Sequence, residues 1–149
     1  QDIIEAVLHD EIGILAMAEK KAIILSEKRN DQDFKPIYEG LVRILNLAKP
    51  KEQGQINTEL FETPSEHDLF EKVKDIENEY KNALNHLEAD QALAKLSELA
   101  DPIHHFFDHN MVMAEDEQVR KNRIALVNQV AELVYDYADL SLIQWKKTV

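Results

Sequence analysis

No segment of this chain shows the alternation of apolar and polar residues that a half-buried β-strand requires. The apolar residues recur every three or four positions instead, as they do on one face of an α-helix. Only three glycines and four prolines occur in 149 residues, which favours long helices with little turn structure. We therefore predict an all-α helical bundle that forms a single domain over residues 1–149.

Capping residues and prolines mark where the helices begin. Thr63, Pro64 and Glu66 have the pattern of a capping box with a first-turn proline. Asp101-Pro102 repeats the cap-then-proline pattern, and Gly13 indicates a joint or a close helix crossing. We expect helical stretches over residues 3–25, 36–48, 63–87, 93–100, from 101 onward and 116–136, a loop over 50–55, and a short turn over 140–145.

Composition limits the compartment and the chemistry. The chain has no cysteine, which excludes disulfides and thiolate metal sites and suits a reducing cytoplasm. No apolar run approaches the ~18 residues of a membrane span, and no signal peptide is visible. We therefore expect a cytoplasmic protein without a membrane partner. The first residue is Gln1 rather than Met, which indicates a fragment of a longer chain.

The net charge of −12 is unevenly distributed. Residues 52–119 carry 4 basic and 17 acidic side chains, whereas residues 1–51 and 120–149 are near neutral, at −1 and +2. Phosphate binding draws on Lys and Arg, so a surface for nucleic acid should be built from the two flanks. The acidic middle is most simply a solvated face that keeps the protein soluble.

Neither a metal site nor a catalytic centre is expected. His105 and His109 lie four residues apart with Asp108 between them and His104 adjacent, a spacing that can bind zinc. No third and fourth ligands follow at a recognised spacing, so surface histidines are the simpler interpretation. The chain also lacks a nucleophile elbow and a glycine-rich phosphate loop, which predicts no catalytic residue and no cofactor.

The segment from Pro102 to Arg123 reads PIHHFFDHNMVMAEDEQVRKNR. It combines a proline start, paired aromatics, a Met-Val-Met step, an acidic triplet and an Arg-Lys-Asn-Arg cluster. It resembles a segment near the C-terminus of the bacterial glycyl-tRNA synthetase beta subunit, within a helical DALR-type anticodon-binding domain. The positions that match the family segment are Pro102, Phe106, Phe107, Asp108, Met111, Val112, Met113, Asp116, Arg120, Asn122 and Arg123.

We expect Met111 and Met113 to fill gaps in the core.

The resemblance extends beyond this segment. Residues 41–47, 60–64 and 138–141 are similar, in order, to three further stretches of the same family, the last being its closing Ala-Asp-Leu-Ser. The similarity covers roughly residues 36–144, and residues 1–35 share only helical character. The chain departs from the family pattern at His104, His105 and Asn110.

The resemblance implies that the chain is a C-terminal piece of a longer beta subunit, with 1–35 as leading helices and 36–144 as the domain core. The full enzyme would join glycine to its tRNA with ATP and Mg, releasing AMP and pyrophosphate. Catalysis would rest largely with an alpha subunit in a heterotetramer. This domain would hold the tRNA anticodon loop, without DNA binding and without catalysis of its own. The alternative is a non-catalytic helical protein–protein interaction module, which the acidic surface would suit equally.

Arg123 lies on the apolar face of the last predicted helix, so it should be buried and paired. Asp108 or Asp116 could hold it in a bidentate bond that fixes the Pro102 helix to the last helix. The competing interpretation is that Arg123 reaches the anticodon. Arg120 and Asn122, near the exposed start of that helix, are better RNA candidates. Asp116 is also a candidate, because a carboxylate matches the amino group of cytosine.

Two further sites could meet RNA. Arg43 and Asn46 lie on the helix face opposite the apolar residues, where Arg43 either pairs with Glu39 or contacts RNA. Phe106 and Phe107 are adjacent, so only one of them can face the core fully. The other ring, assigned to Phe107, could stack on an unpaired base.

Overall fold

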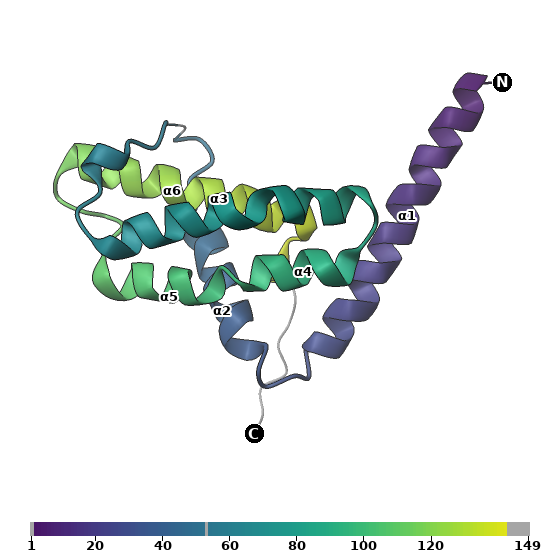
Figure 1. The fold of residues 1–149 in the computed structure, drawn as a ribbon, viewed down its shortest axis with the longest axis horizontal. Coiled ribbons are helices and arrows are strands. Elements are labelled where there is room, and N and C mark those ends of the chain that lie inside the picture. Colours follow the sequence, from purple (N-terminus) through teal and green to yellow (C-terminus); the bar gives the residue numbers. More distant parts are fainter. Residues whose placement is uncertain (1, 53, 143–149) are drawn as a thin grey trace.

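The computed structural model describes residues 2–52 and 54–142, with side chains described from residue 13 onward (Figure 1). Residues 2–52 and 54–142 contain helices and no strand. The prediction of an all-α fold is therefore confirmed. The elements are α1 (Asp2–Lys28), α2 (Lys35–Leu47), the short 3-10 helix η1 (Thr58–Leu60), α3 (Pro64–Asn85), α4 (Ala89–Ser97), α5 (Ala100–His109), α6 (Glu117–Tyr137) and the 3-10 helix η2 (Leu140–Leu142).

The start of α3 is the one predicted from its capping residues. Thr63 is the N-cap, Pro64 occupies the first turn, and Glu66 completes the capping box. The Glu66 carboxylate accepts a hydrogen bond from the backbone N–H of Thr63 at 3.2 Å. Pro36 likewise falls in the first turn of α2, where its missing N–H costs no helical hydrogen bond.

Other predicted boundaries were wrong. α5 begins at Ala100 with Leu99 as its N-cap, so Asp101 is not the capping residue. Pro102 still lies in the first turn, where backbone N–H groups have no acceptor within the helix. α1 runs through Gly13 without a break, and nothing lies within 4 Å of a Cβ built there, so this glycine is neither joint nor crossing. Of the turn expected over 140–145, residues 143–145 lie outside the described residues.

The bundle is built around α6, which is buried along most of its length. α3 packs against α4 and α5, and α2 packs against α5 and α6. In Figure 1, α4 and α5 lie end to end in a row that runs alongside α3 and α6, while α2 crosses them and α1 projects from one side. The largest fully buried side chains include those of Tyr80, Tyr137 and Phe106.

Gly40 permits the close approach of α2 and α5. A Cβ at this position would lie 3.2 Å from Nε2 of His104, tighter than most real contacts. The same nitrogen donates a hydrogen bond to the carbonyl oxygen of Pro36 at 2.8 Å. His104, one of the departures from the family pattern, therefore fastens α5 to α2.

α1 is attached to the bundle along its C-terminal half. Lys20 donates to the carbonyl of Leu87 at 3.0 Å, and Lys21 donates to that of Asp136 at 3.3 Å. Between α1 and the bundle lies an open groove of about 1000 Å³ with mainly apolar walls. Among residues 2–52 and 54–142, no helix is both long and apolar enough to cross a membrane.

Two tyrosine hydroxyls are buried in the core. Tyr80 donates to the carbonyl of Leu133, and Tyr137 donates to that of Ala89 at 3.2 Å. Burial, assisted by the Asp136 carboxylate, raises the pKa of Tyr80 well above its usual value. Burial also raises the pKa of Tyr137, to about 12. Both side chains are therefore held in the neutral form in the folded protein.

We predict unfolding at alkaline pH driven by these two tyrosines. Below pH 10 both folded and unfolded states keep the hydroxyl protons, so this contribution to stability is complete. Between about pH 10 and pH 12 only the unfolded state loses them, and the free energy of unfolding should fall by about 1.4 kcal/mol per pH unit for each tyrosine. Tyrosinate absorbance should rise together with the loss of helical circular dichroism.

Single variants separate this effect from general alkaline damage. Tyr137→Phe should roughly halve the pH slope of the unfolding free energy above pH 10. Tyr135→Phe is the matched control, because that ring is exposed, and it should leave the slope unchanged. Ionisation of Tyr80 and Tyr137 in a fully helical protein would contradict the prediction.

Candidate nucleic-acid interface

The connection between α5 and α6, residues 110–116, lies at the end of the bundle where α3 begins. We call it the 110–116 loop. Its Met111 and Met113 side chains are 75% and 54% exposed, so the expectation that they fill the core was wrong. The loop therefore presents apolar, polarisable side chains to solvent, while buried side chains hold its backbone.

Arg123 is the main anchor beneath the loop. Its side chain is only 7% exposed. Nη1 donates to the carbonyl of Met111 at 2.8 Å, and Nη2 contacts the carboxylates of Glu62 at 3.2 Å and Glu66 at 3.3 Å. The prediction of a buried, paired arginine is confirmed.

The predicted partners of Arg123 were wrong. Asp108 is exposed on α5, and Asp116 caps α6, whereas the observed partners Glu62 and Glu66 come from the start of α3. Arg123 therefore joins α6 to α3 and not to the Pro102 helix. Helical periodicity shows which face a residue occupies but not which distant segment packs against that face.

Glu66 serves two purposes with one carboxylate oxygen. Its Oε1 accepts hydrogen bonds from the backbone N–H groups of Glu62 at 3.0 Å and Thr63 at 3.2 Å, in addition to the Arg123 contact. The Glu66 side chain is fully buried. A buried carboxylate is costly unless it is paired and hydrogen-bonded. Oε1 meets both conditions, whereas Oε2 is buried without a hydrogen-bond partner among the described residues. The cap of α3 and the position of α6 thus depend on the same charge.

Asn110 fixes the other end of the loop. Its Nδ2 donates to Ser65 Oγ and to the carbonyl of Phe106, both at 2.8 Å. Its Oδ1 accepts from Thr63 Oγ1 at 2.9 Å. This departure from the family pattern is therefore a buried amide that ties α5 to the first turn of α3.

Two asparagines of α6 hold the α2–η1 connection, of which the structure describes residues 48–52 and 54–57. Asn122 Oδ1 accepts from the backbone N–H of Asn57 at 2.7 Å, and its Nδ2 donates to the carbonyl of the same residue at 3.0 Å. Asn128 makes the same pair of bonds with Lys49, at 2.7 and 2.9 Å. Asn122 is 3% exposed, so the expectation that it lies on an exposed helix start was wrong.

Asp116 and Arg120 stand at the first turn of α6. Asp116 Oδ1 caps the helix by accepting from the N–H groups of Gln118 at 2.9 Å and Val119 at 3.2 Å. Arg120 is half-buried, and its Nη1 reaches the carbonyl of Ala114 at the long distance of 3.5 Å. The Arg120 guanidinium thus keeps most of its hydrogen-bonding capacity.

Arg43 lies over an aromatic ring, not beside a carboxylate. Its guanidinium carbon is 4.3 Å from the ring centroid of Phe107, and no ion pair with Glu39 occurs in the described structure. Phe107 is 8% exposed and Phe106 is fully buried, so the expectation of one free ring was wrong. Asn46, one turn further along α2, is exposed.

These contacts bring three cations to one part of the surface. Arg43 touches the last turns of α5, Lys49 Nζ lies 3.7 Å from Met113 Sδ, and Arg120 reaches Ala114. We call Arg43, Lys49 and Arg120 the basic rim. Sequence reasoning missed Lys49, because this residue lies beyond the C-terminus of α2, where helical spacing no longer indicates the direction of a side chain.

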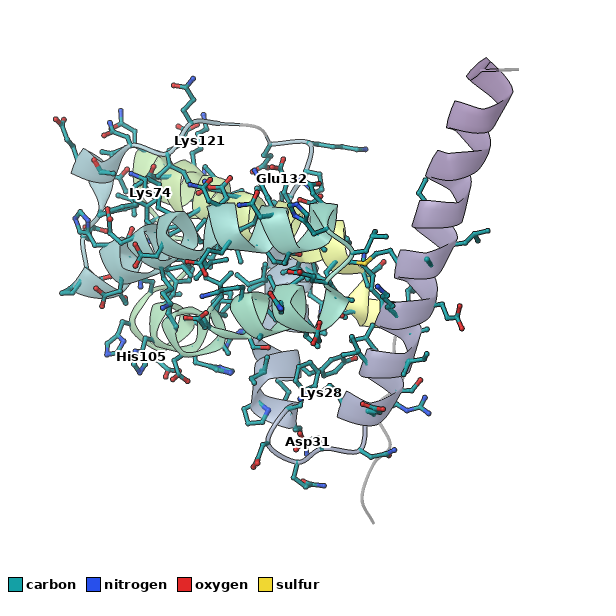
Figure 2. The ribbon with its side chains drawn as sticks, turned by 45° about the vertical axis from the view of Figure 1, so that its right-hand side comes forward. Lys28, Asp31, Lys74, His105, Lys121 and Glu132 are labelled. Carbon is teal, nitrogen blue, oxygen red and sulfur yellow. The ribbon has the colours of Figure 1, made fainter. Side chains whose placement is uncertain are left out.

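The histidines of α5 form no metal site with other described residues. His105 lies at the edge of the bundle (Figure 2). His105 and His109 are both exposed, and their ring centroids are 6.5 Å apart. His109 Nδ1 donates to the carbonyl of His105 at 2.8 Å. Within residues 2–52 and 54–142, no three His, Cys, Asp or Glu side chains are placed to hold a metal ion.

The basic rim beside the anchored loop is a local group of cations on an otherwise acidic protein, which is a feature of surfaces that meet nucleic acid. The chain belongs to the DALR anticodon binding domain family, whose profile matches residues 37–144. The family resemblance found in residues 36–144 is therefore confirmed.

The relatives are all of one kind. The chain is 47% identical to the glycine–tRNA ligase beta subunit of Oceanobacillus iheyensis, over 98% of this chain and 21% of that protein. It is 34% identical to the corresponding subunit of Halalkalibacterium halodurans, over 97% of this chain and 21% of that protein. It is 30% identical to the glycine–tRNA ligase beta subunit of Bacillus subtilis, over 95% of this chain and 21% of that protein. The chain thus spans about a fifth of the length of these relatives.

We predict a large loss of stability in Arg123→Ala. The variant leaves the buried Glu66 carboxylate without its cation, which typically costs about 3–5 kcal/mol. For a chain of this size the melting temperature should fall by roughly 10 °C. Chemical denaturation followed by circular dichroism measures the free energy directly.

Lys121→Ala is the matched control, because Lys121 also pairs with a carboxylate on α6, at 3.0 Å, but in solvent. It should have the melting temperature of the parent protein, since exposed ion pairs contribute little to the free energy of unfolding. A loss in Arg123→Ala no greater than that of the control would contradict a structural role for the buried pair.

Proposed function

We propose that the chain is the C-terminal domain of a glycine–tRNA ligase beta subunit and that it binds the anticodon loop of glycine tRNA. The observation that carries this proposal is the family match over residues 37–144, which contains the whole basic rim. The names of the relatives point to the same enzyme. The competing idea of a protein–protein module has only the acidic composition in its favour.

The basic rim would meet the phosphates of the loop. Arg43, Lys49 and Arg120 come from α2, the α2–η1 connection and α6, outside the acidic stretch of residues 52–119. A chain with a net charge of −12 can therefore still offer a local surface to a polyanion. Single-stranded RNA loops are read by stacking and by hydrogen bonds to splayed base edges, once the backbone is held.

The predicted site residues divide into two groups under this proposal. Asn46 and Arg120 are accessible and would contact RNA directly, as would Asp116, whose exposed carboxylate can accept from a cytosine amino group. Phe107, Asn122 and Arg123 are buried and would act by holding the surface in shape. Arg43 belongs to both groups, because it covers Phe107 while remaining exposed.

The rest of the proposal concerns the longer protein. The whole enzyme would attach glycine to its tRNA with ATP and release AMP and pyrophosphate, with an alpha subunit as partner in a heterotetramer. ATP and Mg would be bound outside this chain, which would have no catalytic residue of its own. We also propose a cytoplasmic location, where tRNA is charged.

The test is a titration of the chain with glycine tRNA at increasing salt. We predict an affinity that falls with salt, with a log–log slope of about −2 if three rim cations meet phosphates of a single-stranded loop. A tRNA of the same sequence with its anticodon replaced should bind more weakly. Absence of binding at low salt, or equal affinity for both tRNAs, would overturn the proposal.

Two arginines of α6 should separate binding from stability. Arg120→Ala should leave the melting temperature nearly unchanged, because the guanidinium makes only the long bond to Ala114 among the described residues, yet it should weaken tRNA binding. The salt slope should become shallower by about one if Arg120 meets a phosphate. Arg123→Ala should mainly lose stability, because the buried Glu66 carboxylate loses its cation. A stable Arg123→Ala protein that binds tRNA poorly, beside an Arg120→Ala protein that binds normally, would reverse the two assignments.

A further inference from the structure

The 110–116 loop exposes two of the three methionines of the chain. Met111 is 75% exposed and Met113 is 54% exposed, whereas Met17 on α1 is only 7% exposed. Because the chain has no cysteine, these thioethers contain its only sulfur atoms. A thioether is oxidised when an oxidant reaches it from solvent, so Met111 and Met113 are the two sulfur groups open to this chemistry.

The fold keeps both side chains in solvent. Val112, which lies between them, is buried, and Arg123 holds the loop backbone through the carbonyl of Met111. Neither exposed methionine contributes to the core, so a gain of polarity at either sulfur disrupts no internal packing. Oxidation in this loop therefore changes the surface of the protein and not its fold.

Met113 lies beside a cation of the basic rim. Lys49 Nζ donates to Met113 Sδ at 3.7 Å. The backbone of Lys49 is fixed by two hydrogen bonds with the Asn128 side chain, at 2.7 and 2.9 Å, which keeps the ammonium group near the loop. A thioether sulfur is a weak acceptor, so in the reduced protein this ammonium group remains available to an anion.

Oxidation converts the weak acceptor into a strong one. Hydrogen peroxide transfers one oxygen atom to the sulfur: an S–O bond forms, the O–O bond breaks and water leaves. The sulfur is oxidised by two electrons and the peroxide is reduced by two. The sulfoxide oxygen carries partial negative charge and is bonded directly to the atom that Lys49 already contacts.

We propose that Met113 is a reversible oxidation site and that its sulfoxide binds Lys49. The Lys49 ammonium group donates to the sulfoxide oxygen in a charge-assisted hydrogen bond, which is stronger than the contact with the thioether. Methionine sulfoxide reductases return the sulfur to the thioether, oxidising thiols and releasing water. Peroxide and reductase thus set the state of one side chain at the edge of the basic rim.

The effect on nucleic acid follows from the charge of the rim, and this step rests on the proposed function. Lys49 is one of three rim cations, so its binding to the sulfoxide leaves Arg43 and Arg120 to meet phosphates. Fewer counterions are then released when RNA binds, which weakens the affinity and makes its salt dependence shallower.

The first experiment locates the oxidation. The folded chain is treated with hydrogen peroxide, the peroxide is removed, and mass spectrometry of the digested protein gives the oxygen gained by each methionine. Met111 and Met113 should oxidise at least about tenfold faster than Met17, the buried control. In concentrated urea the three rates should become similar. The oxidised folded protein should keep the melting temperature of the parent.

The second experiment measures how accessible the Lys49 amine is. Reductive methylation of Lys49 should slow by at least about threefold after oxidation, because the charge-assisted hydrogen bond shields the amine. Lys51 is the matched control, since it is exposed and two residues away. Met111→Leu, which leaves the contact between Lys49 and Met113 in place, should show the same slowing. Met113→Leu should abolish it.

The third experiment measures the binding of glycine tRNA. Oxidised parent protein should bind about fivefold more weakly than reduced protein, the contribution of one exposed ion contact. The log–log salt slope should become shallower by about 0.7. Reductase treatment should restore both values. Met113→Leu should bind like the reduced parent before and after peroxide, and Lys49→Ala should bind weakly with no further loss on oxidation.

The outcomes separate the oxidation site from the function on which its effect rests. Oxidation of Met113 as slow as that of Met17, or unchanged methylation of Lys49 in the oxidised protein, overturns the site whatever the chain binds. A loss of tRNA affinity that persists in Met113→Leu, or no loss in the oxidised parent, overturns the effect on the rim and leaves the proposed function intact. If the parent does not bind glycine tRNA, the proposed function fails, and the methylation rates still decide whether the sulfoxide binds Lys49.

Discussion

The buried ion pair between Arg123 and Glu66 is the interaction on which this end of the molecule depends. Glu66 caps α3 through backbone N–H groups, and Arg123 holds the 110–116 loop through the carbonyl of Met111. Three segments are therefore fixed at one point inside the protein. Because a buried charge without its partner is far more costly than an exposed one, these segments should order together.

α6 extends this anchoring to the surface. Its apolar side fills the core, while the amides of Asn122 and Asn128 bind the backbone of the α2–η1 connection. Each amide pairs with both the N–H and the carbonyl of one residue, as a neighbouring β-strand would. The loop thus gains ordered backbone partners without any sheet, and two members of the basic rim, Lys49 and Arg120, take their positions from α6.

Much of the fold could be predicted from the sequence, and less of the site. Helical periodicity and the Thr63 capping box gave correct elements, because both are local properties of the chain. The partner of Arg123 and the burial of Asn122 are set by packing between segments more than fifty residues apart, which local patterns do not report.

The continuity of α1 has a mechanical consequence. At about 1.5 Å per residue, its 27 residues extend over about 40 Å, and Gly13 introduces no bend. Its C-terminal half is held by Lys20 and Lys21 at two carbonyls of the bundle. Such a helix is a stiff lever arm, so a small change of angle at its far end would swing the whole bundle through an arc. The surface with the basic rim would be carried along without any change in its internal geometry.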